Sequence, residues 1–357
     1  MLSSHAFIPN TLFVTQFKKF PIQTKSRKLD SLQLTCSGIV LNTKSGGHAF
    51  VGYYLSRSLQ KQGVKVTLWN EGFEEELQRS QPFSYYPELQ SLGADILFSN
   101  SAIDTLKDRV KNCDWIVDNF SKSVETAKPL VELAMQVGVR QYLFISSAGI
   151  YKASSMIPHL EDDPINSHSP ISETEQFLLS QNSFAATCFR PIYLVGLKSA
   201  KTSYTDYFFD RIVRGQKVPI PYPGEQLVSL SHVEDLVRMI ILSIDNSKAF
   251  QQIFNATSGK FITFEALAKL CSQVCSKPLH MFCYDADLSS ETFSLFPFRN
   301  RHFTADPRKA QQLLNWNSST NLAENIAEMF AEYLSQQKDK RNISFHEDQQ
   351  LKEIQRV

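Results

Sequence analysis

A regular alternation of short apolar segments and helical segments, beginning near residue 38, constrains this chain more than any other feature. The apolar segments are rich in β-branched and aromatic residues, and the segment from Thr126 to Val137 carries apolar residues on one helical face and ends at Gly138. The predicted strands are 38–43, 64–69, 94–99, 115–120, 141–146 and 186–191. Strands separated by helices in this way predict a parallel sheet covered on both faces, with right-handed connections.

After Pro191 the pattern changes to helices mixed with short strands. The predicted helices are 232–243, 264–274, 306–315 and 322–335, and the predicted strands are 252–256 and 279–284. We therefore expect an α/β protein, with a Rossmann-type doubly wound parallel sheet in residues 34–192 and a smaller C-terminal α+β lobe in 193–337. Strands from 228–258 are expected to return to the sheet, and a ligand is expected in the cleft between the two parts. The charged segment 338–357 is predicted to be a loose tail.

Charge is distributed unevenly along the chain. Its 37 Lys and Arg and 36 Asp and Glu give a net charge of +1, which excludes a polyanion binder that acts through bulk charge. Five of the basic residues and one acid lie in residues 1–30, so the rest of the chain has a balance of −3. No apolar run approaches the roughly 18 residues of a membrane helix, and no integral membrane association is expected.

The first 33 residues are basic, rich in hydroxyl side chains and poor in acids, and they lack the apolar block of a secretory signal. This composition is typical of an organelle transit peptide. Two prolines and a single arginine favour a plastid destination over a mitochondrial one, which would place the mature protein in the chloroplast stroma. A disordered N-terminal tail without an address is the alternative.

The segment SGGHAFVG, residues 45–52, follows a predicted strand and opens a predicted helix, which is the context of a dinucleotide-binding loop. The candidate cofactor-binding residues are Gly46, Gly47, Ala49 and Gly52. Ala49 crowds the point where backbone would approach a pyrophosphate, although helix amides would still attract an anion. Glu71 disfavours the 2′-phosphate of NADP but lies one residue late for an NAD ribose. NAD(P) binding and a glycine turn kept for packing are both left open.

This loop resembles the TGGxGFxG loop of the extended short-chain dehydrogenase/reductase superfamily. Further resemblances follow in the same order at 189–196, 229–237, 254–259 and 313–317. The resemblance implies proton transfer by a serine and a YxxxK pair, in which the lysine lowers the pKa of the tyrosine. Ser146 or Ser147 fits the serine, but Ser167 and Ile171 stand at the tyrosine and lysine positions. A bound NAD(P) is therefore not expected to turn over.

A narrower resemblance is to the chloroplast stem-loop-binding proteins, and it spans about residues 38–357. The segments that carry it are 45–52, 144–152 (FISSAGIYK), 207–221, 298–303 and 315–322. It implies binding and endonucleolytic cleavage of stem-loop RNA with a divalent ion such as Mg²⁺, and association with rRNA and plastid ribosomal particles. It also makes a homo-oligomer or a complex with a paralogue plausible. No cluster of Asp, Glu and His has metal-binding spacing, so catalytic and metal residues are left unassigned.

Phosphate binding needs local positive charge, and several basic residues are candidates for it. The predicted RNA-binding residues are Lys44, His48, Lys152, Arg211, Arg214, Arg299, Arg301 and His302. Lys198, Lys201 and Lys217 are further candidates, whereas Arg190 and His232 are expected to be structural. Tyr207 and Phe208 are predicted to stack on unpaired bases. The alternative for Arg211 and Arg214 is a solvated helix face, and for 298–303 a polar loop that closes the cleft.

Three functions are consistent with these features. The leading hypothesis is a plastid RNA-binding protein, with endoribonuclease activity, on an altered dehydrogenase scaffold. The second is an NAD(P)-dependent epimerase, dehydratase or reductase, which the missing YxxxK pair disfavours. The third is a non-catalytic factor for ribosome assembly.

Overall fold

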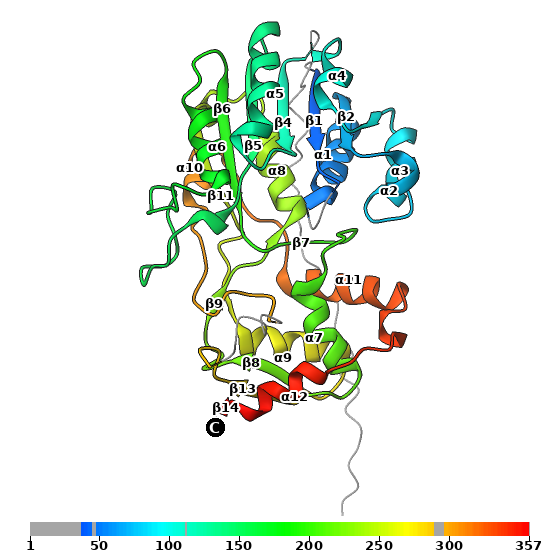
Figure 1. Ribbon diagram of the computed structural model, residues 1–357, viewed down its shortest axis with the longest axis vertical. Coiled ribbons are helices and arrows are strands. Elements are labelled where there is room, and N and C mark those ends of the chain that lie inside the picture. The colour runs from blue at the N-terminus through cyan, green and yellow to red at the C-terminus, as the bar shows by residue number, and fades with distance from the viewer. Residues whose placement is uncertain (1–36, 45–47, 111–112, 289–295, 357) are drawn as a thin grey trace, which may run out of the picture. The chain divides into compact units, whose positions relative to one another are not determined.

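The computed structural model describes residues 37–44, 48–110, 113–288 and 296–356. The predicted leader and the candidate residues Gly46 and Gly47 lie outside these ranges. Seven parallel strands form the central sheet in the order β11-β6-β5-β4-β1-β2-β3 (Figure 1). Their bounds are β1 (Ser37–Asn42), β2 (Lys65–Glu71), β3 (Asp95–Ser99), β4 (Trp115–Asn119), β5 (Gln141–Ile145), β6 (Ala185–Pro191) and β11 (Gln252–Ala256). The sheet confirms the predicted Rossmann-type doubly wound fold, and β11 lies at its edge beside β6.

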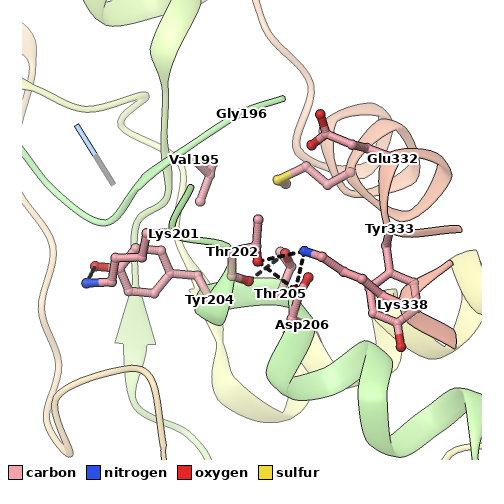
Figure 2. A pocket seen from close by; sticks show the side chains of 11 residues that line it. Val195, Gly196, Lys201, Thr202, Tyr204, Thr205, Asp206, Glu332, Tyr333 and Lys338 are labelled. Atoms are coloured by element: carbon pink, nitrogen blue, oxygen red, sulfur yellow. Dashed lines mark hydrogen bonds and ion pairs between the residues drawn. The ribbon is translucent and has the colours of Figure 1, made fainter. Parts of the chain in front are cut away.

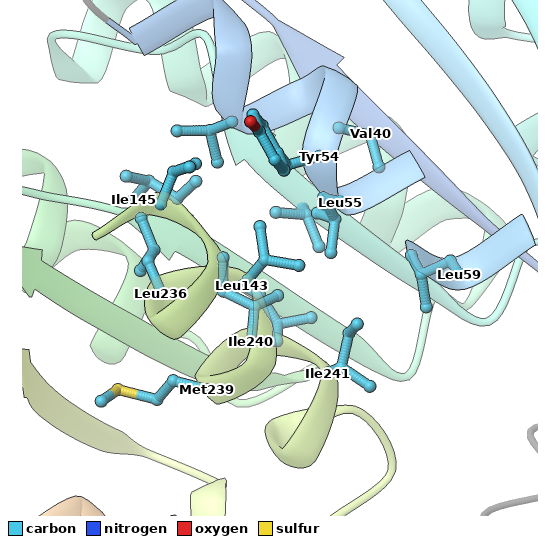
Figure 3. Close-up of a cluster of buried hydrophobic side chains, with 14 of the residues drawn as sticks. Val40, Tyr54, Leu55, Leu59, Leu143, Ile145, Leu236, Met239, Ile240 and Ile241 are labelled. Carbon is cyan, nitrogen blue, oxygen red and sulfur yellow. The ribbon is translucent and has the colours of Figure 1, made fainter. Parts of the chain in front are cut away.

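Helices cover both faces of this sheet. Successive strand side chains point to opposite faces, so Val40 of β1 joins one core while Ile39 and Leu41 join the other. The first core lies under α1 and α8 (Figure 3), and the second lies under α4, α5 and α6. The helices of this part are α1 (Ala49–Lys61), α2 (Glu74–Leu77), α3 (Tyr86–Ser91), α4 (Ala102–Leu106), α5 (Val124–Val137), α6 (Pro170–Leu179), α8 (Val233–Ser243) and α10 (Arg308–Leu314).

Local signals in the sequence set the ends of α5. A capping box between Ser123 and Thr126 satisfies backbone N–H groups at its start. Gly138 ends the helix with a φ of 75°, in the left-handed region that favours glycine. The predicted helix 126–137 therefore ends where expected and begins two residues earlier.

The C-terminal lobe packs three helices around a cluster of phenylalanines that includes Phe208, Phe264 and Phe296. These helices are α7 (Ser203–Val213), α9 (Phe264–Cys275) and α11 (Leu322–Ser335). Short strands complete the lobe: β7 (Leu194–Val195) with β10 (Ser231–His232), β9 (Leu227–Val228) with β12 (Ile262–Thr263), and β8 (Val218–Pro221) with β13 (Met281–Tyr284) and β14 (Gln355–Arg356). The lobe belongs to the same compact unit as the sheet.

The prediction of a loose tail is wrong for residues 338–356. Helix α12 (His346–Glu353) buries Leu351 against Phe282 and Tyr284, and β14 pairs with β13. Lys338 Nζ donates to Thr202 Oγ1 at 2.9 Å and to Asp206 Oδ2 at 2.6 Å, beside a cavity of only about 10 Å³ (Figure 2). These partners lie far upstream in the chain, so the composition of the segment alone could not reveal them.

None of the helices in the described part of the chain has the length and apolar composition needed to cross a membrane.

Candidate functional site

Two adjoining cavities lie at the carboxyl ends of the sheet strands. Strand order reverses between β1 and β4, and ligands of open α/β sheets bind at such a point. The inner cavity, of about 370 Å³, is lined by Thr43, His48, Asn119, Phe120, Ser121, Lys122, Ile145, Ser146, Ser147, Ile171 and Lys201. The outer cavity, of about 350 Å³, is lined by His48, Ser147, Gly149, Pro191, Ile192, Tyr193, Leu194, Tyr204, Phe296, Pro297, Phe298, Arg299 and Phe303. They share His48 and Ser147, and together we call them the cleft.

Three cationic side chains line the cleft: Lys122 after β4, Lys201 before α7, and Arg299. Among residues 37–44, 48–110, 113–288 and 296–356, no Asp or Glu lines either cavity. Lys201 Nζ donates to Tyr204 Oη at 3.1 Å, and Arg299 Nη2 donates to the carbonyl of Gly149 at 3.0 Å. Both acceptors are uncharged, so these contacts orient the two cations without neutralising them.

His48 lies where the two cavities meet. The residue is exposed, and the walls of the two cavities enclose its side chain in part. This partial enclosure, followed by the positive charges of Lys201 and Lys122, lowers the pKa of His48 to about 4. The imidazole is therefore neutral at physiological pH. His48 can accept or donate a hydrogen bond there, but it does not supply the positive charge for which the sequence made it a candidate.

A tyrosine cluster holds the loop that carries Lys201. The Nζ of Lys198 lies 4.7 Å from the ring centroid of Tyr85 and 5.6 Å from that of Tyr53. The backbone N–H of Lys198 donates to Glu332 Oε1 at 2.9 Å. Contacts of an ammonium with aromatic faces are stabilising, and here they hold the loop against Tyr85 and against Tyr53 of α1. The hydrogen bond to Glu332 holds it against α11. Lys198 thus positions the segment from which Lys201 reaches the cleft.

Comparison with known proteins identifies the family. A profile of the NAD dependent epimerase/dehydratase family matches residues 45–256. This chain belongs to the NAD dependent epimerase/dehydratase family. It is also 30% identical over 297 residues to the chloroplast stem-loop binding protein of 41 kDa b from Arabidopsis thaliana, covering 80% of this chain and 77% of the relative. The predicted resemblance is therefore confirmed, and the chloroplastic relative confirms the predicted plastid location.

Solved structures of epimerases share this fold. A UDP-N-acetylglucosamine 4-epimerase from Methanobrevibacter ruminantium M1 is 17% identical with a TM-score of 0.66, over 84% of this chain and 98% of that one. A UDP-glucose 4-epimerase from Bifidobacterium longum, solved with NAD⁺ and UDP, is 16% identical with a TM-score of 0.63, over 84% and 99% of the two chains. At these identities the likeness concerns the fold alone.

The positions that carry proton transfer in the epimerase/dehydratase scaffold hold other groups here. Ile171, at the expected lysine position, lines the inner cavity, and Ser167 precedes the first residue of α6. The hydroxyl of Ser147 accepts the backbone N–H of Gly149 at 3.0 Å. The hydroxyl of Ser146 is buried without a hydrogen-bond partner among the described residues. Ser146 and Ser147 thus line the inner cavity, but no amine stands at the expected lysine position, which Ile171 occupies.

Tyr151 does not replace the missing tyrosine. Its Oη donates to Asn255 Oδ1 at 2.6 Å and accepts from Arg190 Nη1 at 2.9 Å. Arg190 is buried and forms two further bonds to Glu175, at 2.6 and 2.9 Å. Burial raises the pKa of Tyr151. The prediction that Arg190 is structural agrees with this buried network, which joins the segment after β5 to β6, β11 and α6.

At the carboxyl end of β2, where the ribose of a dinucleotide would bind, the described residues do not fit that group. Asn70 is buried and its Oδ1 accepts from Tyr86 Oη at 2.7 Å, while Glu71 pairs with Lys44 at 3.6 Å. Asn42 Nδ2 donates to the carbonyl of Ala49 at 3.0 Å. A Cβ at Gly52 would lie 2.4 Å from Asn42 Cγ, so Gly52 serves close helix–strand packing. The polar groups at the ends of β1 and β2 are therefore bonded within the protein.

Two predicted RNA-binding residues have internal partners instead. Arg211 is 7% exposed, and its guanidinium donates to both oxygens of Asp348 at 2.9 and 2.8 Å. Arg214 donates to Tyr333 Oη at 3.0 Å and to the carbonyls of Lys338 and Arg341, both at 2.8 Å. The predicted phosphate contacts and the solvated helix face are both wrong for this pair, because the C-terminal segment covers it.

The stacking prediction for the same helix is also wrong. Tyr207 is buried and its Oη donates to the carbonyl of Pro219 at 2.7 Å. Phe208 is fully buried in the core of the lobe. Three partly exposed aromatic side chains that the sequence analysis did not select line the cleft: Tyr193 and Tyr204 in the outer cavity and Phe120 in the inner cavity.

The other candidates lie in different settings. Lys44 is exposed but paired with Glu71, and Lys152 is exposed and does not line either cavity. Arg301 is half-buried with its guanidinium 5.7 Å from the ring centroid of Phe303, and His302 Nδ1 accepts from the backbone N–H of Leu227 at 3.0 Å. Arg301 therefore lies beside Phe303 of the outer cavity, but neither Arg301 nor His302 lines that cavity.

No metal site emerges from the residues that the structure describes. Within them, no three His, Cys, Asp or Glu side chains gather as a metal ion would require. Asp118, near the end of β4, is fully buried and accepts from Tyr142 Oη at 2.7 Å and from the backbone N–H groups of Phe120 and Ser121. Lys122, directly after Ser121, was not selected from the sequence. Its position after β4, a strand whose carboxyl end lies at the cleft, was the signal that could have identified it.

Proposed function

We propose that this protein binds stem-loop RNA of the plastid through the cleft. One observation carries the proposal: Lys122, Lys201 and Arg299 line a concave surface to which no carboxylate of the described residues contributes. A cleft lined by one sign of charge concentrates counter-ions of the opposite sign even when the net charge is small. The partly exposed rings of Tyr193 and Tyr204 add stacking surfaces for bases. The stem-loop binding relative supports this class of ligand.

A salt-dependent gel shift with a structured plastid 3′ end tests the proposal. Each phosphate contact contributes roughly 0.7–0.9 to the slope of log affinity against log salt concentration. Lys122→Glu with Lys201→Glu is therefore expected to weaken binding and to reduce the slope by about one to two units. Lys248→Glu is the matched control, because Lys248 is exposed just before β11, at the amino ends of the strands. Absence of a shift at low salt, or equal slopes for all three proteins, contradicts the proposal.

Cleavage of the bound RNA with Mg²⁺, and action on rRNA and ribosomal particles, are further parts of the proposal that rest on the family resemblance. To distinguish cleavage from binding, the purified full chain is incubated with an end-labelled stem-loop in the presence of Mg²⁺ or of EDTA. Defined fragments that need Mg²⁺ support an endoribonuclease. Intact RNA with tight binding favours a non-catalytic assembly factor.

A second candidate is NAD(P)-dependent chemistry, which the family and the position of the inner cavity at the strand-order reversal favour. The residues at the carboxyl end of β2 and Ile171 disfavour it. A saturable change in NADH fluorescence on titration of the full chain would support a bound dinucleotide. An unchanged fluorescence spectrum would argue against a bound dinucleotide and favour RNA as the ligand of the cleft.

A further inference from the structure

We infer that the cleft recognises one unpaired nucleotide of the RNA, whose base enters the outer cavity and whose phosphate enters the inner cavity. This inference rests on the proposed function and narrows it to the unpaired part of a stem-loop. It is drawn from the size of the two cavities, from the two tyrosines of the outer cavity and the two lysines of the inner cavity, and from a buried hydroxyl in the wall of the inner cavity that has no partner among the described residues.

The cavities have the dimensions of small-molecule sites. Their volumes of about 350 and about 370 Å³ lie near the lower end of the usual range for such pockets. A paired base in an A-form helix cannot enter a concave site, because its edge faces its partner and its faces lie against its neighbours. Unpaired bases in loops and bulges expose both, and proteins recognise them by stacking. The cleft therefore suits a single exposed nucleotide and not a duplex.

The outer cavity carries the stacking surfaces. Tyr204 is stacked on Phe298 with ring centroids 5.5 Å apart, and Tyr193 meets Phe298 edge-on at 4.9 Å. Packing thus fixes both tyrosines at the cavity wall. The guanidinium of Arg299 lies 4.6 Å from the ring centroid of Phe303 and supplies a further planar group on which a base can stack.

The backbone conformation of Tyr193 also supports a binding site at the outer cavity. Its φ of 40° lies in the left-handed region, which is unfavourable for a bulky side chain. The Oη of Tyr193 accepts the backbone N–H of Arg299 at 2.9 Å, so the strained residue and the arginine are held together. Strain of this kind is found where a site fixes the direction of a side chain.

The inner cavity carries the groups that suit a phosphate. Lys122 and Lys201 line it, and both can donate to phosphate oxygens. The hydroxyl of Ser146 is buried and has no partner among the described residues, an arrangement that is unfavourable until an acceptor is supplied. His48 and Ser147 lie at the junction of the cavities, which places them beside the ribose of a nucleotide that spans both.

Two RNA hairpins with the same stem test this inference on the full chain. One is closed by unpaired nucleotides that include 2-aminopurine, and the other by a flexible glycol linker without bases. Base stacking on aromatic side chains predicts about five- to 150-fold tighter binding of the first hairpin, with a change in 2-aminopurine fluorescence. Equal affinity for both hairpins overturns the inference and leaves the proposed function intact. If neither hairpin binds, the proposed function itself fails.

Substitutions locate the preference in the cleft. Tyr204→Leu is expected to abolish most of the preference for the nucleotide loop, measured as the ratio of the affinities for the two hairpins, because loss of the Tyr204 Oη contact with Lys201 affects both hairpins alike. Tyr222→Leu is the matched control, because Tyr222 is 46% exposed and does not line either cavity. Arg299→Gln is a second variant should Tyr204→Leu alter the circular dichroism spectrum. A loop preference that survives both cleft variants overturns the inference.

Competition experiments with free nucleotides show whether the cleft binds a nucleotide of the RNA or a free dinucleotide. Uridine monophosphate is expected to displace the looped hairpin at concentrations where uridine does not, because the inner cavity holds the phosphate. Displacement by NAD⁺ at concentrations where uridine monophosphate has no effect assigns the cleft to a dinucleotide and overturns the inference.

Discussion

Two sets of basic residues, all of them candidates for phosphate binding in the sequence, have different partners in the structure, and we call them the first and second clusters. Arg211 and Arg214 direct their donors to Asp348, Tyr333 and backbone carbonyls, under the C-terminal segment. Among the described residues, the hydrogen bonds of Lys201 and Arg299 go to uncharged acceptors, and both side chains line an open cleft. A phosphate therefore meets uncompensated charge only at the second cluster. Basic character in a sequence indicates a nucleic-acid surface only after the internal partners of each residue are known.

The largest expected effect is on stability, at the first cluster. Removing one partner of a buried ion pair leaves the other charge unpaired, which costs about 3–5 kcal/mol. Arg211→Ala is therefore expected to lower the free energy of unfolding by about that amount in urea denaturation. Lys352→Ala, at an exposed position on the same helix as Asp348, should change it by less than about 0.5 kcal/mol. Equal effects of the two variants contradict the assignment of Arg211 to a structural role.

The second prediction concerns RNA binding at the rim of the outer cavity. Arg299→Glu combined with Arg301→Glu is expected to weaken binding about tenfold or more and to lower the salt slope by about one unit per lost phosphate contact. The free energy of unfolding should change little, since both side chains are at least partly exposed. Salt-dependent filter binding measures the slope. An unchanged slope removes this loop from the RNA-binding surface.

A smaller effect is expected from Lys198, which does not line the cleft. Lys198→Ala removes the contacts with Tyr53 and Tyr85 and frees the loop that carries Lys201. We expect RNA affinity to fall a few-fold, since a cation–π contact contributes about 0.5–2 kcal/mol. Lys198→Arg keeps the cation over the rings and should restore most of the affinity. If both variants bind like the original chain, the tyrosine cluster does not position Lys201.

The smallest effect is on the titration of His48. Enclosure and the charges of Lys201 and Lys122 lower the pKa of His48 to about 4, below the value of about 6.5 expected in the unfolded chain. The unfolded state then binds more protons between about pH 4 and pH 6.5, so the contribution of His48 to stability is present above pH 6.5 and is lost as the pH falls toward 4. Histidine NMR resonances report this pKa. Lys201→Gln should raise it and Lys248→Gln should not; a pKa near 6.5 in the original chain contradicts the geometry of the cleft.

Local patterns were enough to predict the sheet. The seven strands and α5 follow from apolar runs, Gly138 and the capping residues near Ser123, all of which act within a few positions, whereas the short helices α2, α3 and α4 were not predicted. The smaller lobe and the structural role of Arg190 were also expected. The tail could not be predicted, because α12 depends on an arginine 137 positions upstream.

The candidate site was predicted less well, for the same physical reason. His48 and Arg299, two of the predicted RNA-binding residues, line the cleft, whereas Lys122, Tyr193 and Tyr204 line it and were not selected. Exposure of an aromatic ring depends on which neighbours cover it: Tyr207 is buried and Tyr204, one turn earlier on the same helix, is half-exposed. The pairing of an arginine with a distant acid is equally invisible to local composition.

Photo-crosslinking tests the central claim most directly. A stem-loop RNA with 4-thiouridine in its loop is irradiated in complex with the full chain, and the modified peptides are mapped by mass spectrometry. The structure predicts crosslinks in segments 119–122, 193–204 and 296–303, which contribute residues to the cleft. Crosslinks confined to 207–217 and 338–352, where the first basic cluster meets the C-terminal segment, would contradict it.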